Sequence, residues 1–176
     1  MNTVHSNITF GKKLVARYNV TGTKWNGQEE QVPVRVSLLD NNLDYIGLFD
    51  RERIMDIGFY NMFDGICGMH PTRSEYIVED ERNKKILGIA ECRKFEDLFA
   101  IKEIGTNRTG RYKGIGKALI AGICKDVRGK YSRINLNNPT EKNYGFYKKC
   151  HFTQEGDSLF LLEKDYDKLI EDAEEQ

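Results

Sequence analysis

Alternating apolar and polar residues mark five stretches of this chain as β-strands. They are residues 13–20, 32–39, 75–79, 86–93 and 98–106. The first two are separated by 21–31, which contains two glycines and predicts a hairpin-like pair. The last three are separated by short polar turns, so we expect them to form an antiparallel meander. Within 86–93, the alternation predicts one face made of Ile86, Gly88, Ala90 and Cys92 and another made of Leu87, Ile89 and Glu91.

The apolar period becomes helical after residue 114. Ile115, Leu119, Ile123 and Val127 recur every four residues, and Gly129 suits the position just after a helix end. We therefore expect a helix running to about residue 128.

The alternation of 132–137 predicts a further strand. Because a helix connects it to 98–106, these two strands should be parallel. A second helix is expected from about 138 to 150, because Pro139 cannot continue a strand ladder.

The remaining segments carry weaker signals. Strands are expected at 152–154 and 158–163, and the acidic tail from Lys164 should form a helix with an apolar side. Residues 41–74 have mixed periodicity and are interpreted as two short helices followed by a loop.

Composition limits the classes of function. The chain has 176 residues, 27 basic and 27 acidic, so general nucleic-acid binding is not expected. Seven basic residues and one acidic residue fall within 108–130, whereas 163–176 holds seven acidic and two basic residues. No secretory signal or membrane-spanning run is visible, and the four cysteines are scattered, which favours a reducing, cytoplasmic setting.

The start of the helix after 114 is predicted to bind phosphate. It follows a strand and reads Arg-x-x-Gly-x-Gly from Arg111 to Gly116. The first turn of a helix has N–H groups without partners and a partial positive charge, and glycines let an anion approach them closely. A dinucleotide fingerprint is excluded by Leu119, and a P-loop by its spacing and by Ala118 in place of a hydroxyl.

This segment resembles the acyl-CoA loop of the GNAT acetyltransferase superfamily, whose motif is Arg/Gln-x-x-Gly-x-Gly/Ala. A second family mark, Tyr followed by Lys-x-Gly-Phe, is matched by Tyr147 to Phe152, with His151 in place of the glycine. Many members carry an asparagine seven residues before this tyrosine, where the chain has Thr140 with Asn138 and Asn143 nearby. The resemblance covers roughly residues 75–163.

The resemblance implies an α/β fold. Its mixed, mostly antiparallel sheet would be splayed at a V between two parallel strands, with helices on both faces. We expect one acyltransferase domain over 1–176: a variable, acceptor-side part at 1–74, a CoA-binding core at 75–163 and an acidic tail at 164–176.

The implied function is direct transfer of an acetyl group from acetyl-CoA to an amine. Tyr147 would protonate the leaving thiolate, and Glu103 would take the proton of the amine, with Glu91 and Glu96 as rivals. Expected cofactor-binding residues are Ile104, Thr106, Arg111, Tyr112, Lys113, Gly114, Ile115, Gly116, Lys117, Asn138, Thr140 and Asn143. The strand residues Ile104 and Thr106 would pair with pantetheine amides through their backbone.

Several alternatives stay open. The acceptor is a small amine, an antibiotic, a protein or peptide, or a charged tRNA, and the acyl group is acetyl or longer. A non-catalytic CoA-binding or protein-interaction module of the same fold is the main rival, and a homodimer is an open alternative. No metal is expected, because Cys67–His70 and Cys150–His151 lack finger-like spacing.

Overall fold

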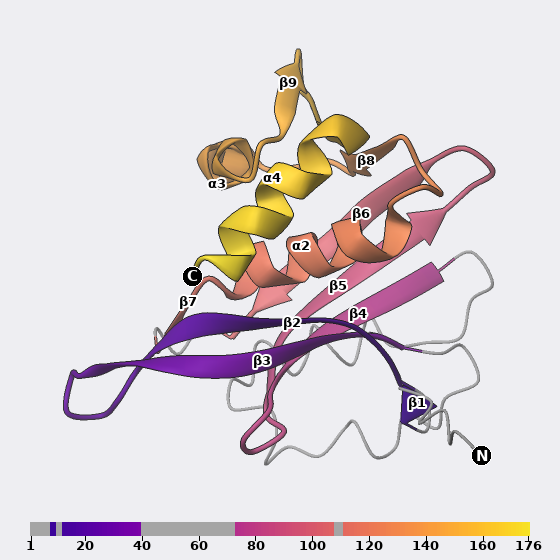
Figure 1. Cartoon of the computed structure of the whole chain (residues 1–176). Coiled ribbons are helices and arrows are strands. Elements are labelled where there is room, and N and C mark those ends of the chain that lie inside the picture. The colour runs from indigo at the N-terminus through magenta and orange to yellow at the C-terminus, as the bar shows by residue number, and fades with distance from the viewer. Residues whose placement is uncertain (1–7, 10–11, 40–72, 108–110) are drawn as a thin grey trace, which may run out of the picture.

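The chain folds into one sheet with helices packed on it (Figure 1). The computed structural model describes residues 8–9, 12–39, 73–107 and 111–176. Its strands are β1 (Ile8–Thr9), β2 (Lys12–Thr23), β3 (Glu29–Leu39), β4 (Arg73–Asp80), β5 (Ile86–Lys94), β6 (Phe99–Thr106), β7 (Tyr112–Lys113), β8 (Arg133–Leu136), β9 (Thr153–Glu155) and β10 (Ser158–Leu162). Its helices are α2 (Ile115–Val127), the 3₁₀ turn η3 (Glu141–Asn143), α3 (Tyr144–Lys149) and α4 (Glu163–Glu174).

The strands follow the order β1-β2-β3-β4-β5-β6-β8-β10-β9, with β7 paired to β2. Pairing from β1 to β6 is antiparallel throughout, so the predicted hairpin and meander are confirmed. The β6–β8 pair is parallel, as the connecting helix predicts. The fold class is therefore confirmed as α/β with a mixed, mostly antiparallel sheet.

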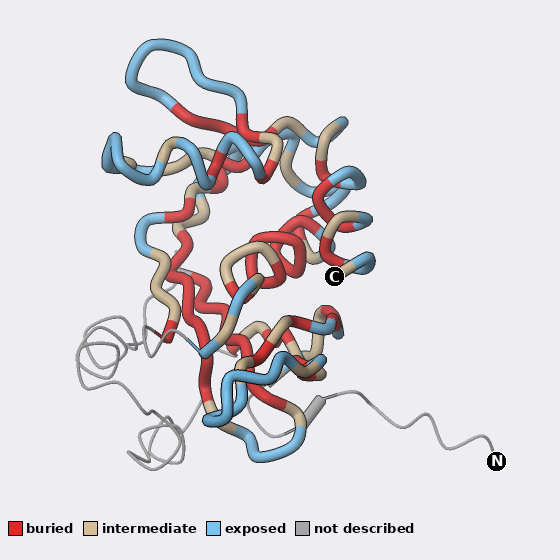
Figure 2. The backbone as a smooth tube through the Cα atoms, turned by 90° about the vertical axis from the view of Figure 1, so that its left-hand side faces the viewer, coloured by how far each residue is buried: buried red, intermediate tan, exposed pale blue. Residues whose placement is uncertain are grey.

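Helix α2 organises the core. Ile115, Leu119, Ile123 and Val127 are all buried, as their period predicts. Figure 2 shows this helix as buried along most of its length. Residues between the periodic positions are buried too, because α2 lies between the sheet and α4.

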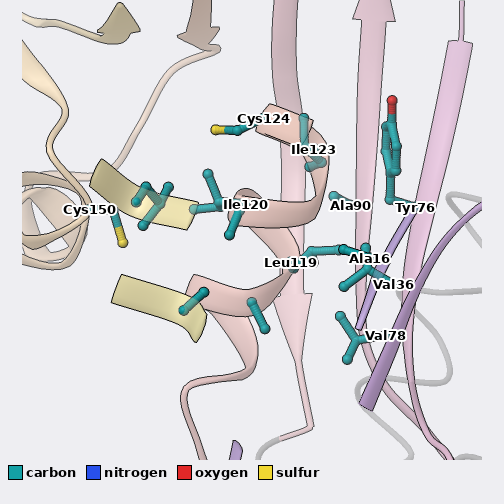
Figure 3. Packing of buried hydrophobic residues seen from close by; sticks show 14 of the residues in the cluster. Ala16, Val36, Tyr76, Val78, Ala90, Leu119, Ile120, Ile123, Cys124 and Cys150 are labelled. Carbon is teal, nitrogen blue, oxygen red and sulfur yellow. The ribbon is translucent and has the colours of Figure 1, made fainter. Parts of the chain in front are cut away.

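Side chains from both sides of α2 make this arrangement clear. Leu119 points toward the sheet residues Ala16 and Val36, whereas Ile120 and Cys124 point to the opposite side, where α4 lies (Figure 3). A helix that is apolar on nearly all sides is expected where two layers cover it.

Helix α4 forms as expected from the acidic tail. Its apolar side, Tyr166, Leu169, Ile170 and Ala173, is buried. Its polar side pairs with basic residues of α2 and its C-terminal cap: Arg128 Nη2 lies 2.7 Å from an Asp167 oxygen and Lys125 Nζ lies 4.0 Å from a Glu174 oxygen. Two acidic side chains of the tail are thus placed beside the basic segment of the same chain.

Two local expectations were wrong. Leu87 joins the core on the α2 side with Ala90 and Cys92, because the β4–β5 register shifts between Val78 and Glu79 and breaks the alternation. The segment 138–150 is not one helix, since the 3₁₀ turn η3 precedes α3.

The two short helices expected within 41–74 lie outside the described residues, as do Cys67 and His70. In the described part of the chain, no helix has the length and apolarity needed to cross a membrane.

The turn after α3 keeps its left-handed geometry without glycine. His151 has φ +68°, and its Nε2 lies 2.7 Å from Asp172 Oδ2 of α4. A side chain at positive φ costs about 1 kcal/mol relative to glycine. An exposed ion pair contributes about 0–1 kcal/mol, so the contact with α4 offsets part of that cost.

We therefore expect His151→Gly in an Asp172→Asn background to raise the free energy of unfolding by about 1 kcal/mol. In the parent background the gain should be smaller, because the contact with Asp172 is lost as well. The parent protein, the two single variants and the double variant form a double-mutant cycle. Their urea unfolding measures both the cost of the positive φ at position 151 and the contribution of the His151–Asp172 contact. Destabilisation by His151→Gly in the Asp172→Asn background would contradict the strain argument.

Candidate functional site

The sheet opens where β6 and β8 part. Their register covers only Phe99–Ile101 and Ile134–Leu136, and the last bond of the ladder runs from Asn137 N–H to the Ile101 carbonyl (3.0 Å). Strand β6 continues to Thr106 beyond this point, whereas β8 ends. The expected V between parallel strands thus begins after Ile101.

A bulge in β6 lies at the same point. Glu103 lies opposite Glu91, but Ile101 lies opposite Cys92, so Lys102 has no partner in the register. A bulge bends a strand and redirects its side chains. Lys102 and Glu103 are therefore presented at the opening.

A cavity of about 250 Å³ occupies the V, and we call it the V cavity. It is lined by Ile101, Lys102, Glu103, Ile104, Leu136, Asn137, Asn138, Pro139, Thr140, Asn143 and Tyr147. Six of the predicted site residues are thus brought together from β6, the connection after β8, η3 and α3: Glu103, Ile104, Asn138, Thr140, Asn143 and Tyr147. Thr106 and residues 111–117 do not line it.

Tyr147 is held firmly against this cavity. Its side chain is 6% exposed, and its ring packs against those of Phe146 and Phe152 at centroid distances of 5.1 and 5.4 Å. Burial, with a smaller contribution from the Cys150 thiol, raises the pKa of Tyr147 above its usual value of 10. The phenol therefore keeps its proton at neutral pH and is available as a proton donor.

The three candidate bases lie in different surroundings. Glu103 is exposed and lines the V cavity, whereas Glu96 lines a different cavity, next to the β5–β6 turn. Glu91 is 3% exposed, and its Oε1 lies 3.0 Å from Arg93 Nη2 and 3.8 Å from Lys102 Nζ. Of the three, Glu103 alone lines the V cavity, so it is the best placed.

The asparagine-rich turn closes the V cavity on the α3 side. Asn143 Nδ2 donates to Thr140 Oγ1 (2.9 Å), which ties η3 to its own start. Asn138 has φ +49°, a conformation that asparagine tolerates better than most residues. Thr140 and Asn143 thus hold each other in place at the mouth of the cavity.

The Gly-rich segment forms a second part of the site. Tyr112 and Lys113 pair with Gly22 and Thr21 of β2, an anchor that the sequence pattern did not reveal. Gly114 then caps α2 with φ +96°, and its carbonyl accepts the first helical bond, from Ala118 N–H (2.9 Å). No side chain caps this helix, so the N–H groups of its first turn can bind an anion.

Two side chains crowd these glycines. The Gln176 carboxamide lies where a Cβ on Gly114 would be, and a Cβ at Gly116 would lie 2.9 Å from Phe146 Cζ. Figure 1 shows the C-terminal end beside β7. Gln176 Nε2 is buried and has no hydrogen-bond partner among the described residues, so a polar group lies unsatisfied where an anion would sit.

The basic residues near the loop are partly engaged. Lys113 Nζ lies 3.6 Å from a Glu29 oxygen, with both side chains well exposed. Arg111 is exposed, Lys117 is half-buried in the first turn of α2, and Tyr112 is partly buried. The side chain of Ile115 packs into the core, so this residue can contribute only its backbone to a ligand.

The structure argues against a nucleophilic role for Cys150. Burial is the main factor that raises the pKa of the Cys150 thiol to about 11, and the neighbouring His151 contacts Asp172 instead. Cys92, Cys124 and Cys150 are buried free thiols. Among the described residues, no group of His, Cys, Asp and Glu side chains is arranged to hold a metal ion.

The family model for the acetyltransferase (GNAT) domain matches residues 72–154. This match spans the meander, the Gly-rich segment, α2 and the tyrosine helix. No curated protein matches the chain in sequence.

Solved structures share the fold at low identity. A probable acetyltransferase of the GNAT family from Chromobacterium violaceum is 12% identical with a TM-score of 0.56, over 76% of this chain and 85% of that one. A mutant of the toxin AtaT, bound to the C-terminus of the antitoxin AtaR and acetyl-CoA, is 16% identical with a TM-score of 0.52. The match covers 77% of this chain and 97% of that one. At such identities the likeness is one of fold.

Proposed function

Because the chain belongs to the GNAT acetyltransferase family through its domain at residues 72–154, we propose that it transfers an acetyl group directly from acetyl-CoA to an amine. The observation that carries the proposal is the V cavity, where Tyr147 and Glu103 line one space between the parting strands. Residues 1–176 would act as one domain, with the acidic tail serving as helix α4. A cytoplasmic setting is part of the proposal, in keeping with the buried free thiols.

The donor would bind along two parts of the site. The first-turn N–H groups of α2 would hold its diphosphate, with Gly114 and Gly116 allowing close approach and Arg111, Lys113 and Lys117 adding positive charge. Ile104 and Thr106 lie on the part of β6 that extends beyond β8, so their backbone would pair with the pantetheine amides. Gln176 would leave the corner when the donor binds, as a flexible side-chain end can.

The chemistry follows from the groups in the V cavity. The amine nitrogen forms a bond to the thioester carbonyl carbon while Glu103 accepts an amine proton, directly or through water. The carbon–sulfur bond then breaks, and the Tyr147 hydroxyl donates its proton to the leaving thiolate. The products are an amide and the free thiol of CoA; Glu103 then releases its proton to solvent and Tyr147 regains one from solvent. Holding both reactants in place can lower the barrier by about 7–11 kcal/mol.

The test is acetyl-CoA binding by calorimetry, together with thiol release in the presence of amines, peptides and aminoglycosides. Binding accompanied by amine-dependent thiol release supports the proposal. Binding without release from any amine favours the second candidate, a non-catalytic CoA-binding module. No binding at all, with Gln176 still seated on Gly114, favours a protein-interaction module.

Glu103→Gln is expected to lower turnover about a hundredfold near neutral pH, because general-base catalysis contributes about 10²–10⁴-fold. Glu96→Gln is the matched control, since Glu96 lines a different cavity and should leave turnover unchanged. A Glu103→Gln protein with full turnover would remove the base role.

A further inference from the structure

A second cavity, of about 710 Å³, lies next to the V cavity. We call it the acceptor groove, and its lining is Arg93, Phe95, Leu98, Ala100, Lys102, Asn135, Leu136 and Asn137. Three of these residues, Lys102, Leu136 and Asn137, also line the V cavity, so the two cavities are adjacent.

The acceptor groove opens on the sheet face away from α2. Ile101 and Ile134 belong to the core on the α2 side, so the alternate residues Ala100 and Asn135 point the other way. Cys92 faces the same core, which places Arg93 on the face of the groove. A molecule in the groove would thus approach the V cavity from the side opposite to α2.

The groove combines an apolar wall with positive charge. Phe95 is 54% exposed and Leu98 is 38% exposed, so both offer apolar surface to a ligand. Arg93 and Lys102 are the charged side chains in the described lining, and they share one buried carboxylate, that of Glu91. Arg93 and Lys102 thus supply the positive charge of the described lining.

Lys102 lies at the junction of the two cavities, next to Glu103. As the bulged residue of β6 it lines both spaces, and its side chain is 40% exposed. An acceptor amine must reach Glu103, which is next to Lys102. The Lys102 ammonium repels a second positive group on the acceptor and attracts a negative one.

We propose that the acceptor is an amine that also carries a carboxylate and an apolar group, such as a hydrophobic α-amino acid. Its carboxylate is bound by Lys102 and Arg93, its apolar group lies against Phe95 and Leu98, and its amine faces Glu103. This inference rests on the proposed acetyl transfer and names the substrate class for it. Polyamines, aminoglycosides and basic peptides are disfavoured by the same charges.

The experiment compares phenylalanine with phenethylamine, which lacks only the carboxylate, and with spermidine. We expect kcat/KM for phenylalanine to exceed that for phenethylamine about tenfold or more, because a charge-assisted hydrogen bond is gained. Lys102→Gln should lower kcat/KM for phenylalanine about tenfold, and it should not lower kcat/KM for phenethylamine, whose ammonium Lys102 repels. Arg93→Gln should also lower kcat/KM for phenylalanine. Lys94→Gln, which lies outside the groove, should leave kcat/KM unchanged for both phenylalanine and phenethylamine.

The outcomes separate the two proposals. If the protein binds acetyl-CoA and acetylates phenethylamine or spermidine as well as phenylalanine, the acceptor class is wrong and the transferase proposal stands. If acetyl-CoA does not bind, both the transferase proposal and the acceptor class are wrong. Calorimetric binding of phenylalanine to the CoA complex, weakened by Lys102→Gln, would support the site without any turnover measurement. Binding unaffected by Lys102→Gln would overturn it.

Discussion

Replacing Tyr147 with phenylalanine is expected to lower turnover about a hundredfold or more while leaving acetyl-CoA affinity nearly unchanged, because proton donation contributes about 10²–10⁴-fold. The ring itself is retained, so its packing against Phe146 and Phe152 should survive. Only the hydroxyl that would protonate the leaving thiolate is removed.

The protonation state of Tyr147 supports this expectation. Burial raises the pKa of the phenol, so the proton-bearing form persists from neutral pH to above the usual value of 10. The activity that depends on Tyr147 should therefore be lost only on the alkaline side, as pH rises through the raised pKa. The phenylalanine variant should lack that alkaline limb.

Tyr144→Phe is the matched control on the same helix. Its hydroxyl lies 3.5 Å from the Asp157 carbonyl and does not line the V cavity, so this variant should keep full turnover. Steady-state thiol release and calorimetric binding of acetyl-CoA measure both variants. Equal turnover for Tyr147→Phe and the parent protein would exclude the acid role.

The sequence predicted the structure correctly where the spacing of nearby apolar residues determines a helix or strand. Ile115, Leu119, Ile123 and Val127 predicted α2 and its buried side, and the helix between 98–106 and 132–137 predicted their parallel pairing. Residues of the Gly-rich turn also fell where the pattern expects them, with Gly114 at positive φ. Each of these features depends on residues close together in the chain.

Features set by register or by distant segments could not be predicted. The bulges at Leu87 and Lys102 arise from how two strands pair, and alternation alone gives no sign of them. One bulge moves Leu87 into the core, and the other presents Lys102 to two cavities. The site geometry thus depends on pairing that no short motif encodes.

The same distinction applies to the residues of the candidate site: those marked by a local pattern were predicted, and one that depends on contacts between distant segments was not. Tyr147 and Glu103 were found from motifs and strand position, and both line the V cavity. Gln176 was missed because its contact with Gly114 requires α4 to pack along α2, which depends on apolar residues throughout both helices. The clue available in sequence was the pairing of an acidic tail with a basic segment.

Gln176 leads to the second prediction of large effect. Its carboxamide lies against Gly114, in the corner proposed for the diphosphate of the donor. Gln176→Glu would place a carboxylate of the same shape there, and the first turn of α2 favours negative charge by about 0.3–1 kcal/mol. The new carboxylate should then compete with the donor for the same N–H groups.

We expect Gln176→Glu to weaken acetyl-CoA binding about tenfold or more, since a charge-assisted interaction of about 1.4 kcal/mol or more must be given up. Gln176→Ala should bind the donor at least as tightly as the parent protein, because the corner is then open. The difference between the two variants should shrink as salt is raised, since screening weakens the contribution of charge.

Calorimetry at low and high salt measures these affinities, and Gln154→Glu is the control for the added charge. Gln154 is exposed on β9 and bonds only locally, to the Gly156 carbonyl (3.0 Å), so its replacement should leave affinity unchanged. Equal affinities for the Gln176→Glu and Gln176→Ala variants would mean that the donor's phosphates bind elsewhere. Affinity that follows the charge at position 176 would instead tie the diphosphate to the first turn of α2, because no other described group lies against Gly114 as closely.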